Sequence, residues 1–222
     1  EIVWFVDGAE NALLRNLSSI SPQNLRKNQI WTASVRVSDG KNLSSFYNST
    51  NLQIINSAPI QTNPAITSDD NKFRRTSTLT CNSNAFDIDN DVITNFIKWY
   101  KNNKLIFSST ENKLKPGNFS KNDNVICEAN SFDGKVNSTP LNSTSLKISN
   151  SAPILVSQLQ NKTWSQGKNA TINLINAFMD IDGDEIKYSA SQVENITIKI
   201  DNHLKTVILM PDQSFNGVRK LI

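Results

Sequence analysis

The chain has 222 residues and a formal net charge of +3, and it is dominated by 31 Asn, 26 Ser and 15 Thr, with a single His. At roughly 100 to 200 residues per domain, this length corresponds to about two domains' worth of chain. The weak, scattered charge is not that of a nucleic-acid surface, no apolar run approaches the ~20 residues of a membrane span, and the side-chain chemistry argues against most catalytic sites. We therefore expect no nucleic-acid partner, no membrane span in this segment and no enzymatic activity.

An internal repeat of about 94 residues organises the chain. The run Asn-Ser-Ala-Pro at 56–59 recurs at 150–153, and Asp-Gly at 39–40 recurs at 133–134, both at an offset of 94. The repeat predicts a partial domain at 1–57 that lacks its N-terminal strands. It also predicts a complete domain at 58–151 and a third domain at 152–222 that lacks its last strand.

Within each repeat, apolar residues alternate with polar ones at the period of half-buried β-strands. The residues expected to face inward are, in chain order, Trp31, Ala33, Val35 and Val37; Leu79 and Cys81; Ile97 and Trp99; Val125, Cys127 and Ala129; Leu146 and Ile148; Ile172 and Leu174; Ile196, Ile198 and Ile200; Val207 and Leu209. Short strands separated by polar turns are typical of sandwiches, and Asn is expected to take many turn positions in place of Gly. The predicted fold class is all-β, with tandem immunoglobulin-like or cadherin-like β-sandwiches.

Cys81 and Cys127 are the only cysteines, and each lies on the inward phase of a predicted strand. Trp99 follows Cys81 by 18 residues and precedes Cys127 by 28. This spacing matches the immunoglobulin pattern of an inter-sheet disulfide beside a strand tryptophan, so we predict a Cys81–Cys127 disulfide, with two buried reduced thiols as the alternative. An oxidised pair favours an extracellular or cell-surface location.

Two acidic loops carry alternating aspartates, namely Asp87, Asp89 and Asp91 in the first loop and Asp180, Asp182 and Asp184 in the second. An oxygen-only set of ligands on a turn suits a hard cation, so we predict that both loops bind structural Ca²⁺. An EF-hand is excluded, because that loop needs Gly sixth and Glu twelfth, whereas here Gly183 is fourth and Ser191 is twelfth. The alternative is a solvated acidic loop that Ile88 or Ile181 anchors to the core.

The predicted topology indicates where each acidic loop lies relative to the linker between domains. In an immunoglobulin-like sandwich, the connection between the second and third strands lies at the same end as the domain's N-terminus. Each acidic loop is therefore predicted to face the preceding domain, beside the Asn-Ser-Ala-Pro linker, where a bound cation would stiffen the connection. The proline of the linker also favours an extended, semi-rigid chain.

Asn-X-Ser/Thr sequons mark nine candidate N-glycosylation sites, which are Asn16, Asn42, Asn48, Asn118, Asn137, Asn142, Asn161, Asn169 and Asn195. Composition alone would give about six, so the excess is modest. The sequons nevertheless support N-glycosylation, because the cysteine pair already favours an exported chain. We expect at least three of them to carry glycans, and the alternative is that several are ordinary polar residues of turns.

Several of these motifs together resemble a known group of proteins. The Trp-Tyr-Lys-Asn run from Trp99, the Lys-Asn-Asp-Asn-Val-Ile-Cys-Glu run at 121–128 and the Asn-Ser-Ala-Pro linkers resemble tandem immunoglobulin-like domains of archaeal and bacterial cell-surface proteins. The runs at 180–188 and 211–217 are similar to the cadherin-like modules of the same kinds of protein. The resemblance implies Ca²⁺ at the six aspartates named above.

The leading functional hypothesis is a structural or adhesive module of a large extracellular or cell-surface protein, such as a surface layer, filament or adhesin. It would act as a Ca²⁺-stiffened, glycosylated array of sandwiches. Its expected partners are further domains of the same chain and identical or related subunits at the cell surface. The alternatives are the non-catalytic stalk of an exported glycosidase or protease, and a sugar-binding module that uses an exposed aromatic such as Trp164.

Overall fold

The computed structural model describes residues 1–219, and nearly all of their regular structure is β-strand. The strands are β1 (Ile2–Val6), β2 (Ala9–Glu10), β3 (Ile30–Val35), β4 (Tyr47–Asn48), β5 (Leu52–Gln53), β6 (Ile60–Gln61), β7 (Ala65–Ser68), β8 (Leu79–Asn82), β9 (Ala85–Phe86), β10 (Thr94–Lys101), β11 (Lys104–Ser109), β12 (Lys113–Leu114), β13 (Asn124–Phe132), β14 (Leu141–Asn142), β15 (Leu146–Lys147), β16 (Ile154–Leu155), β17 (Ala170–Asn173), β18 (Phe178–Met179), β19 (Ile196–Asp201) and β20 (Thr206–Pro211). The short 3-10 helices are η1 (Ala12–Leu14) and η2 (Pro22–Asn24). The end of the predicted third domain, residues 220–222, lies outside the described residues.

The chain divides into two compact units. The first unit comprises residues 1–67, 80–114 and 126–145, and the second comprises residues 68–79, 115–125 and 146–222. This division does not follow the repeat, because both units include parts of the segment 58–151. The first acidic loop and first linker belong to the first unit, and the second loop and second linker belong to the second.

The first unit opens with an antiparallel sheet in the order β2-β1-β3-β4, in which β5 also pairs with β3. Trp31 on β3 is buried as predicted, but Val35 is 40% exposed and Val37 is 66% exposed. Ser34, on the opposite face of β3, is only 5% exposed. The prediction that Val35 and Val37 face a core is therefore wrong, because residues 1–57 form one sheet and contribute no second layer of strands.

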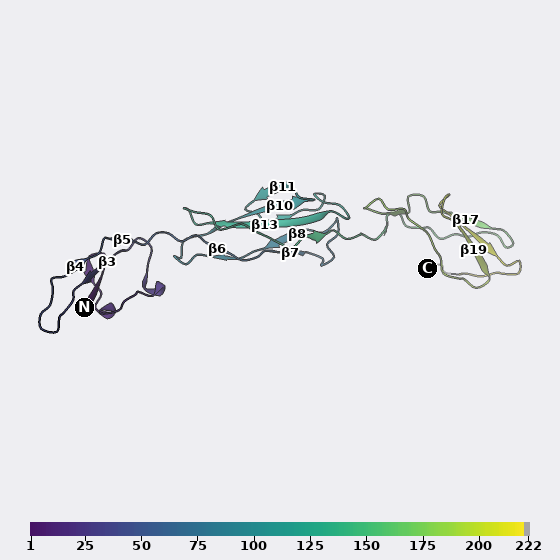
Figure 1. Ribbon diagram of the computed structural model, residues 1–222. Helices are drawn as coiled ribbons and strands as arrows, with labels where there is room; N and C mark the ends of the chain where they lie inside the picture. Colours follow the sequence, from purple (N-terminus) through teal and green to yellow (C-terminus); the bar gives the residue numbers. More distant parts are fainter. Residues whose placement is uncertain (220–222) are drawn as a thin grey trace. The chain divides into compact units, whose positions relative to one another are not determined.

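A two-layer sandwich follows, built mostly from residues of the first unit (Figure 1). One layer contains β11, β10, β13 and β14 in that order, and the other contains β12, β8 and β7. Figure 1 shows β10, β11 and β13 together in one layer, with β7 and β8 in the other. Ile97 and Trp99 of β10 are at most 2% exposed, which confirms the inward phase that the sequence predicts for this strand.

A disulfide joins the two layers of this sandwich. It links Cys81 of β8 to Cys127 of β13, with 6.1 Å between the two Cα atoms. Both cysteines are at most 1% exposed and Trp99 is fully buried. The predicted pairing is thus present, and the alternative of two reduced thiols is not what the structure shows.

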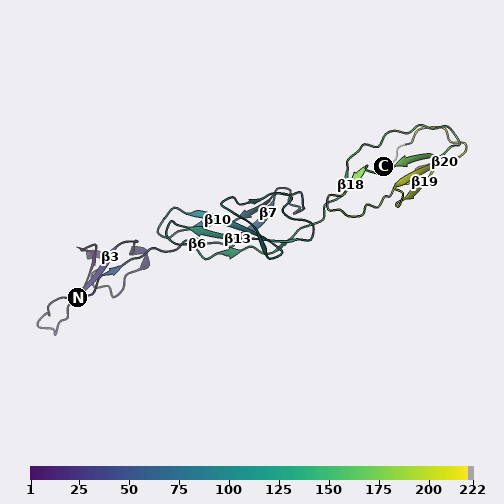
Figure 2. The same cartoon turned by 90° about the horizontal axis from the view of Figure 1, so that it is seen from above.

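The second unit contains a three-stranded sheet, β17-β20-β19, and a two-stranded sheet formed by β16 and β18. Figure 2 shows β19 and β20 side by side, and their antiparallel pairing runs from Ile196 opposite Pro211 to Asp201 opposite Thr206. The predicted inward residues Val207 and Leu209 lie in its core cluster.

A carboxylate organises the turn that follows β7 in the second unit. The Asp70 carboxylate accepts hydrogen bonds from the Lys72 backbone N–H at 2.9 Å and the Ser77 hydroxyl at 2.8 Å, and it pairs with the Arg74 guanidinium at 2.9 Å. These donors hold the pKa of Asp70 well below its usual range, and the Lys72 N–H makes the largest contribution. The turn is therefore held by a side chain that stays ionised at neutral pH.

Asparagine takes over turn positions that glycine often occupies. Of the twelve non-glycine residues with positive φ among residues 1–219, nine are Asn. Asn can occupy these positions because its short side chain tolerates the left-handed region of backbone conformation better than most other non-glycine side chains do. The prediction from the scarcity of Gly and the abundance of Asn is confirmed.

Candidate metal centres in the acidic loops

Strand pairing places each acidic loop beside a linker. The strand β6 follows the first linker directly and pairs antiparallel with β9, so that Ile60 lies opposite Phe86. The first acidic loop begins at the next residue, Asp87. In the second unit β16 follows the second linker and pairs with β18, with Ile154 opposite Met179, and the second loop begins immediately afterwards.

Both loops have the same internal hydrogen bonds. The Asp87 Oδ1 atom accepts the backbone N–H groups of Asp89 at 2.8 Å and Asp91 at 3.4 Å. In the second loop, Oδ1 of the first aspartate accepts the corresponding N–H groups at 2.8 and 3.2 Å. The left-handed position between the second and third aspartates is Asn90 in one loop, with φ 62°, and Gly183 in the other, with φ 82°. The Gly-to-Asn difference therefore leaves the backbone conformation in place.

The linkers contact the loops directly. The Ser57 backbone N–H donates to Asp89 Oδ2 at 2.7 Å, and the Ser151 backbone N–H donates to Asp182 Oδ2 at 2.6 Å. These two contacts confirm that each loop faces the linker that precedes it. The Asp-Gly turn after β13 joins the first site, because Asn56 Nδ2 donates to Asp133 Oδ2 at 2.8 Å.

A lysine from the preceding repeat pairs with the third aspartate of each loop. Lys27 Nζ contacts Asp91 Oδ2, and Lys121 Nζ contacts Asp184 Oδ1. The aspartate hydrogen bond raises the pKa of each lysine, and the charges of the other two aspartates in the loop raise it further. The lysine contacts were not predicted. The available signal was the repeat, since Lys-Asn at 27–28 recurs at 121–122.

Buried oxygen atoms without a hydrogen-bond donor accompany both loops. At the first loop they are Asp87 Oδ2 and Asn56 Oδ1, and at the second they are Asp180 Oδ2, Asp182 Oδ1 and Ser151 Oγ. Asp87 is 9% exposed and Ser151 is 4% exposed. A buried oxygen without a donor is costly, and a bound cation would satisfy it. The residues present therefore fit a hard cation such as Ca²⁺.

The two loops differ in how closely their carboxylates gather. One carboxylate oxygen from each of Asp87, Asp89 and Asp91 lies within 4.8 Å of the others. Within residues 1–219, the second loop does not gather three carboxylates in this way. Ile88 is 68% exposed and Ile181 is 37% exposed, so the alternative in which these isoleucines anchor the loops to a core is wrong.

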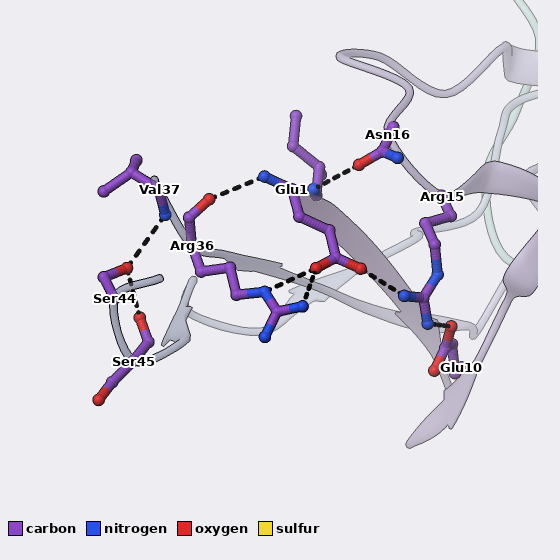
Figure 3. Close-up of polar contacts among 9 residues, drawn as sticks. Glu1, Glu10, Arg15, Asn16, Arg36, Val37, Ser44 and Ser45 are labelled. Atoms are coloured by element: carbon purple, nitrogen blue, oxygen red, sulfur yellow. Dashed lines mark hydrogen bonds and ion pairs between the residues drawn. The ribbon is translucent and has the colours of Figure 1, made fainter. Parts of the chain in front are cut away.

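A separate charged cluster lies on the sheet of residues 1–57 (Figure 3). The Glu1 carboxylate lies between the guanidinium groups of Arg36 and Arg15, and Arg15 also pairs with Glu10. The pKa of Glu1 is lowered mainly by the hydrogen bond that its carboxylate accepts from Arg36. The Arg36 guanidinium also stacks over the Phe46 ring at 4.5 Å. Both arginines are therefore paired with carboxylates, and these ion pairs link segments that lie up to 35 positions apart in the sequence.

The predicted glycosylation sites are exposed, whereas the predicted sugar-binding aromatic is not. All nine sequon asparagines, at 16, 42, 48, 118, 137, 142, 161, 169 and 195, are exposed. Trp164 packs against the core cluster of the second unit, so it is not an exposed aromatic platform for sugars. Among residues 1–219, no helix has the length and apolar character needed to cross a membrane.

The two facing sheets, the disulfide between them and the buried tryptophan define a protein of tandem immunoglobulin-like β-sandwiches. No known family model matches the sequence. No curated protein matches it either. Among solved structures, the chain is similar to domains A168-A170 from titin, with a TM-score of 0.34 and 10% sequence identity. The match covers 67% of this chain and 54% of the titin chain, so it spans about half the length of that neighbour.

Proposed function

We propose that this chain is a segment of an extracellular or cell-surface protein in which tandem sandwiches form a structural or adhesive array. In this role Ca²⁺ at each acidic loop stiffens the connection between successive sandwiches. The observation that carries the proposal is a contact that occurs twice. In each case a linker serine donates its N–H to the second aspartate of the loop, beside buried oxygens that lack a donor.

The physical role of the cation follows from the charges. Three aspartates gather within one turn of the first loop, where they repel one another and Lys27 pairs with only one of them. Ca²⁺ takes six to eight oxygen ligands, which carboxylates, amide oxygens and water supply. At the first loop the aspartates and the side-chain Oδ1 atom of Asn56 are the candidate ligands. A cation held there would join the loop to the linker and restrict movement of the linker.

Calcium is expected to stabilise the wild-type chain, and the Asp87→Asn variant is expected to lose the response of the first loop. A cation at about 100 times its Kd stabilises the folded state by about 2.7 kcal/mol. The amide keeps an oxygen to accept the two loop N–H groups but removes one of three like charges. In EDTA the variant should therefore match or exceed the wild type in melting temperature, and in excess Ca²⁺ it should melt lower.

Differential scanning calorimetry of the chain in EDTA and in Ca²⁺ measures this reversal. Glu111→Gln is the matched control, because it removes one acidic charge from the exposed connection between β11 and β12 and should leave the calcium response unchanged. If wild type and Asp87→Asn shift equally on addition of Ca²⁺, the first loop is not a calcium site.

The remaining features of the proposal concern the setting. The disulfide and the exposed sequons support an exported, glycosylated protein, in which case its partners are further domains of the same chain and related subunits at a cell surface. The acidic loops and linkers support kinship with immunoglobulin-like and cadherin-like domains of archaeal and bacterial surface proteins. Protein isolated from its source is expected to lose mass on enzymatic or chemical deglycosylation, and an unchanged mass would contradict this part.

A further inference from the structure

The lysines that contact the acidic loops occupy the same place in successive repeats. Each stands before an asparagine with positive φ, Asn28 at 71° and Asn122 at 70°. The N–H of that asparagine donates to the carbonyl oxygen of Ile54 at 2.8 Å in one case and of Ile148 at 3.0 Å in the other. Both isoleucines lie two residues before a linker Asn, at positions 56 and 150. The backbone therefore fastens the lysine-bearing turn to the start of each linker.

These backbone hydrogen bonds fix the position of the lysine-bearing turn, and so of its ammonium group, beside the acidic loop. A second backbone hydrogen bond closes each turn, from the N–H of Ile54 to the Gln29 carbonyl oxygen at 2.8 Å and from the N–H of Ile148 to the Asp123 carbonyl oxygen at 2.9 Å. The lysine side chains are 15% and 25% exposed, so each ion pair is partly shielded from water. Such a pair is screened less by salt than a fully exposed one.

The charges at each loop can be counted. The three aspartates of the first loop carry three negative charges, and Lys27 contributes one positive charge. Lys121 does the same for the three aspartates of the second loop. The lysine thus removes part of the negative charge that each loop offers to an ion. Two further charged groups lie nearby, since Asn56 links the Asp133 carboxylate to the first loop and Arg75 Nη1 donates to the Ile181 carbonyl oxygen of the second loop at 2.8 Å. The ammonium group repels a trivalent cation more strongly than a divalent one, because the Coulomb energy is proportional to the charge of the ion.

We propose that Lys27 and Lys121 are specificity-determining residues of the acidic loops, which fit each loop to a divalent cation and hold its third aspartate when the cation is absent. The inference rests on the cation sites of the proposed function. Lysine repels cations, so its presence at a cation site is not that of a ligand. The expected effect of its substitution on cation affinity is therefore opposite to that of substituting a ligand. Removing a ligand weakens binding, whereas removing this lysine strengthens it.

The test compares Ca²⁺ with Tb³⁺ on the Lys27→Met variant, which keeps an unbranched side chain and loses the charge. A unit charge about 6 Å from the ion changes the affinity for a divalent cation about tenfold even at the dielectric constant of water. Because the Coulomb energy is proportional to ionic charge, the same removal raises the Tb³⁺ affinity about thirtyfold. The ratio of Tb³⁺ to Ca²⁺ affinity should therefore rise about threefold.

Isothermal titration calorimetry of the 222-residue chain measures both affinities at one fixed ionic strength. Asp180→Asn and Asp182→Asn are present in every sample, so that the titration reports on the first loop. Lys27→Arg keeps the charge and is expected to keep the wild-type ratio. Lys104→Met removes the same charge from the exposed start of β11 and is the matched control.

Hydrogen exchange in EDTA tests the holding role without a cation. Amides at 87–91 are expected to exchange faster in Lys27→Met than in wild type, and Lys27→Arg should restore the slow rate. If wild type binds cations but Lys27→Met leaves the Tb³⁺ to Ca²⁺ ratio unchanged or weakens both ions, the specificity role is overturned and the proposed calcium function stands. If wild type binds neither ion, the calcium function and the specificity role both fail, and faster exchange in Lys27→Met then supports the lysine as the fastener of the loop.

Discussion

Replacing Cys81 and Cys127 together with Ala is expected to lower the free energy of unfolding of the sandwich that they bridge by about 4 kcal/mol. The disulfide joins residues 46 positions apart, and in the chain-entropy model a crosslink of that span restricts the unfolded chain by about this amount. Both sulfur atoms lie in the core, where the cysteines are at most 1% exposed. Replacing both cysteines avoids leaving a lone buried thiol, so the measured loss reports mainly on the crosslink.

Urea unfolding monitored by hydrogen exchange of peptides from β10 and β13 measures this loss. Peptide resolution is needed because a chain with several sandwiches does not unfold in one two-state step. The wild type treated with a reducing agent should approach the stability of the double variant, which provides the matched control without a mutation. A loss below about 1 kcal/mol would show that the bond adds little to this fold.

The Trp99→Ala substitution is expected to destabilise the same sandwich by about 3–5 kcal/mol, the usual cost of truncating a fully buried aromatic residue. Trp99 has no exposed surface, so truncation leaves a cavity between the two layers. Its indole Nε1 is buried and has no hydrogen-bond acceptor. Trp99→Phe should therefore cost much less than Trp99→Ala, because it fills most of the volume and removes an unsatisfied donor.

The same exchange measurement on β10 and β13 peptides checks the tryptophan series. Trp164→Ala is the control, since Trp164 is only partly buried and packs on the core of the second unit. Its smaller effect should appear in peptides from β19 and β20. Equal losses in Trp99→Ala and Trp164→Ala, or a larger loss in Trp99→Phe than in Trp99→Ala, would contradict the assigned role of Trp99.

The strand predictions succeeded where two layers of the fold are present. The alternation around Ile97 and Trp99 indicates an inward face, and the structure buries that face. The same alternation failed at Val35 and Val37, because period-two patterning identifies a face but not whether another layer covers it. Residues 1–57 form one sheet, so these valines remain exposed.

The acidic loops illustrate a second limit. Their aspartate spacing and their repetition could be read from the sequence, and their place beside the linkers followed from the predicted immunoglobulin-like topology. The contacts of Lys27 with Asp91 and of Asn56 with Asp133 join residues 64 and 77 positions apart, and only folding brings them together. The sequence analysis identified the carboxylates of each loop and missed the ammonium group that pairs with one of them.

The amino-acid order alone establishes the repeat and the two aspartate triplets, and it predicts the strands and the cysteine pairing, because side-chain periodicity and motif spacing can be read along the chain. The net charge of each loop, the identity of its buried oxygens without donors and the exposure of Val35 and Val37 emerged from the folded chain. They depend on long-range strand pairing, such as that of β6 with β9, which places distant side chains within hydrogen-bonding distance. The spacing of residues along the chain does not show which distant side chains meet after folding. The lysine contacts could therefore be found only in the structure.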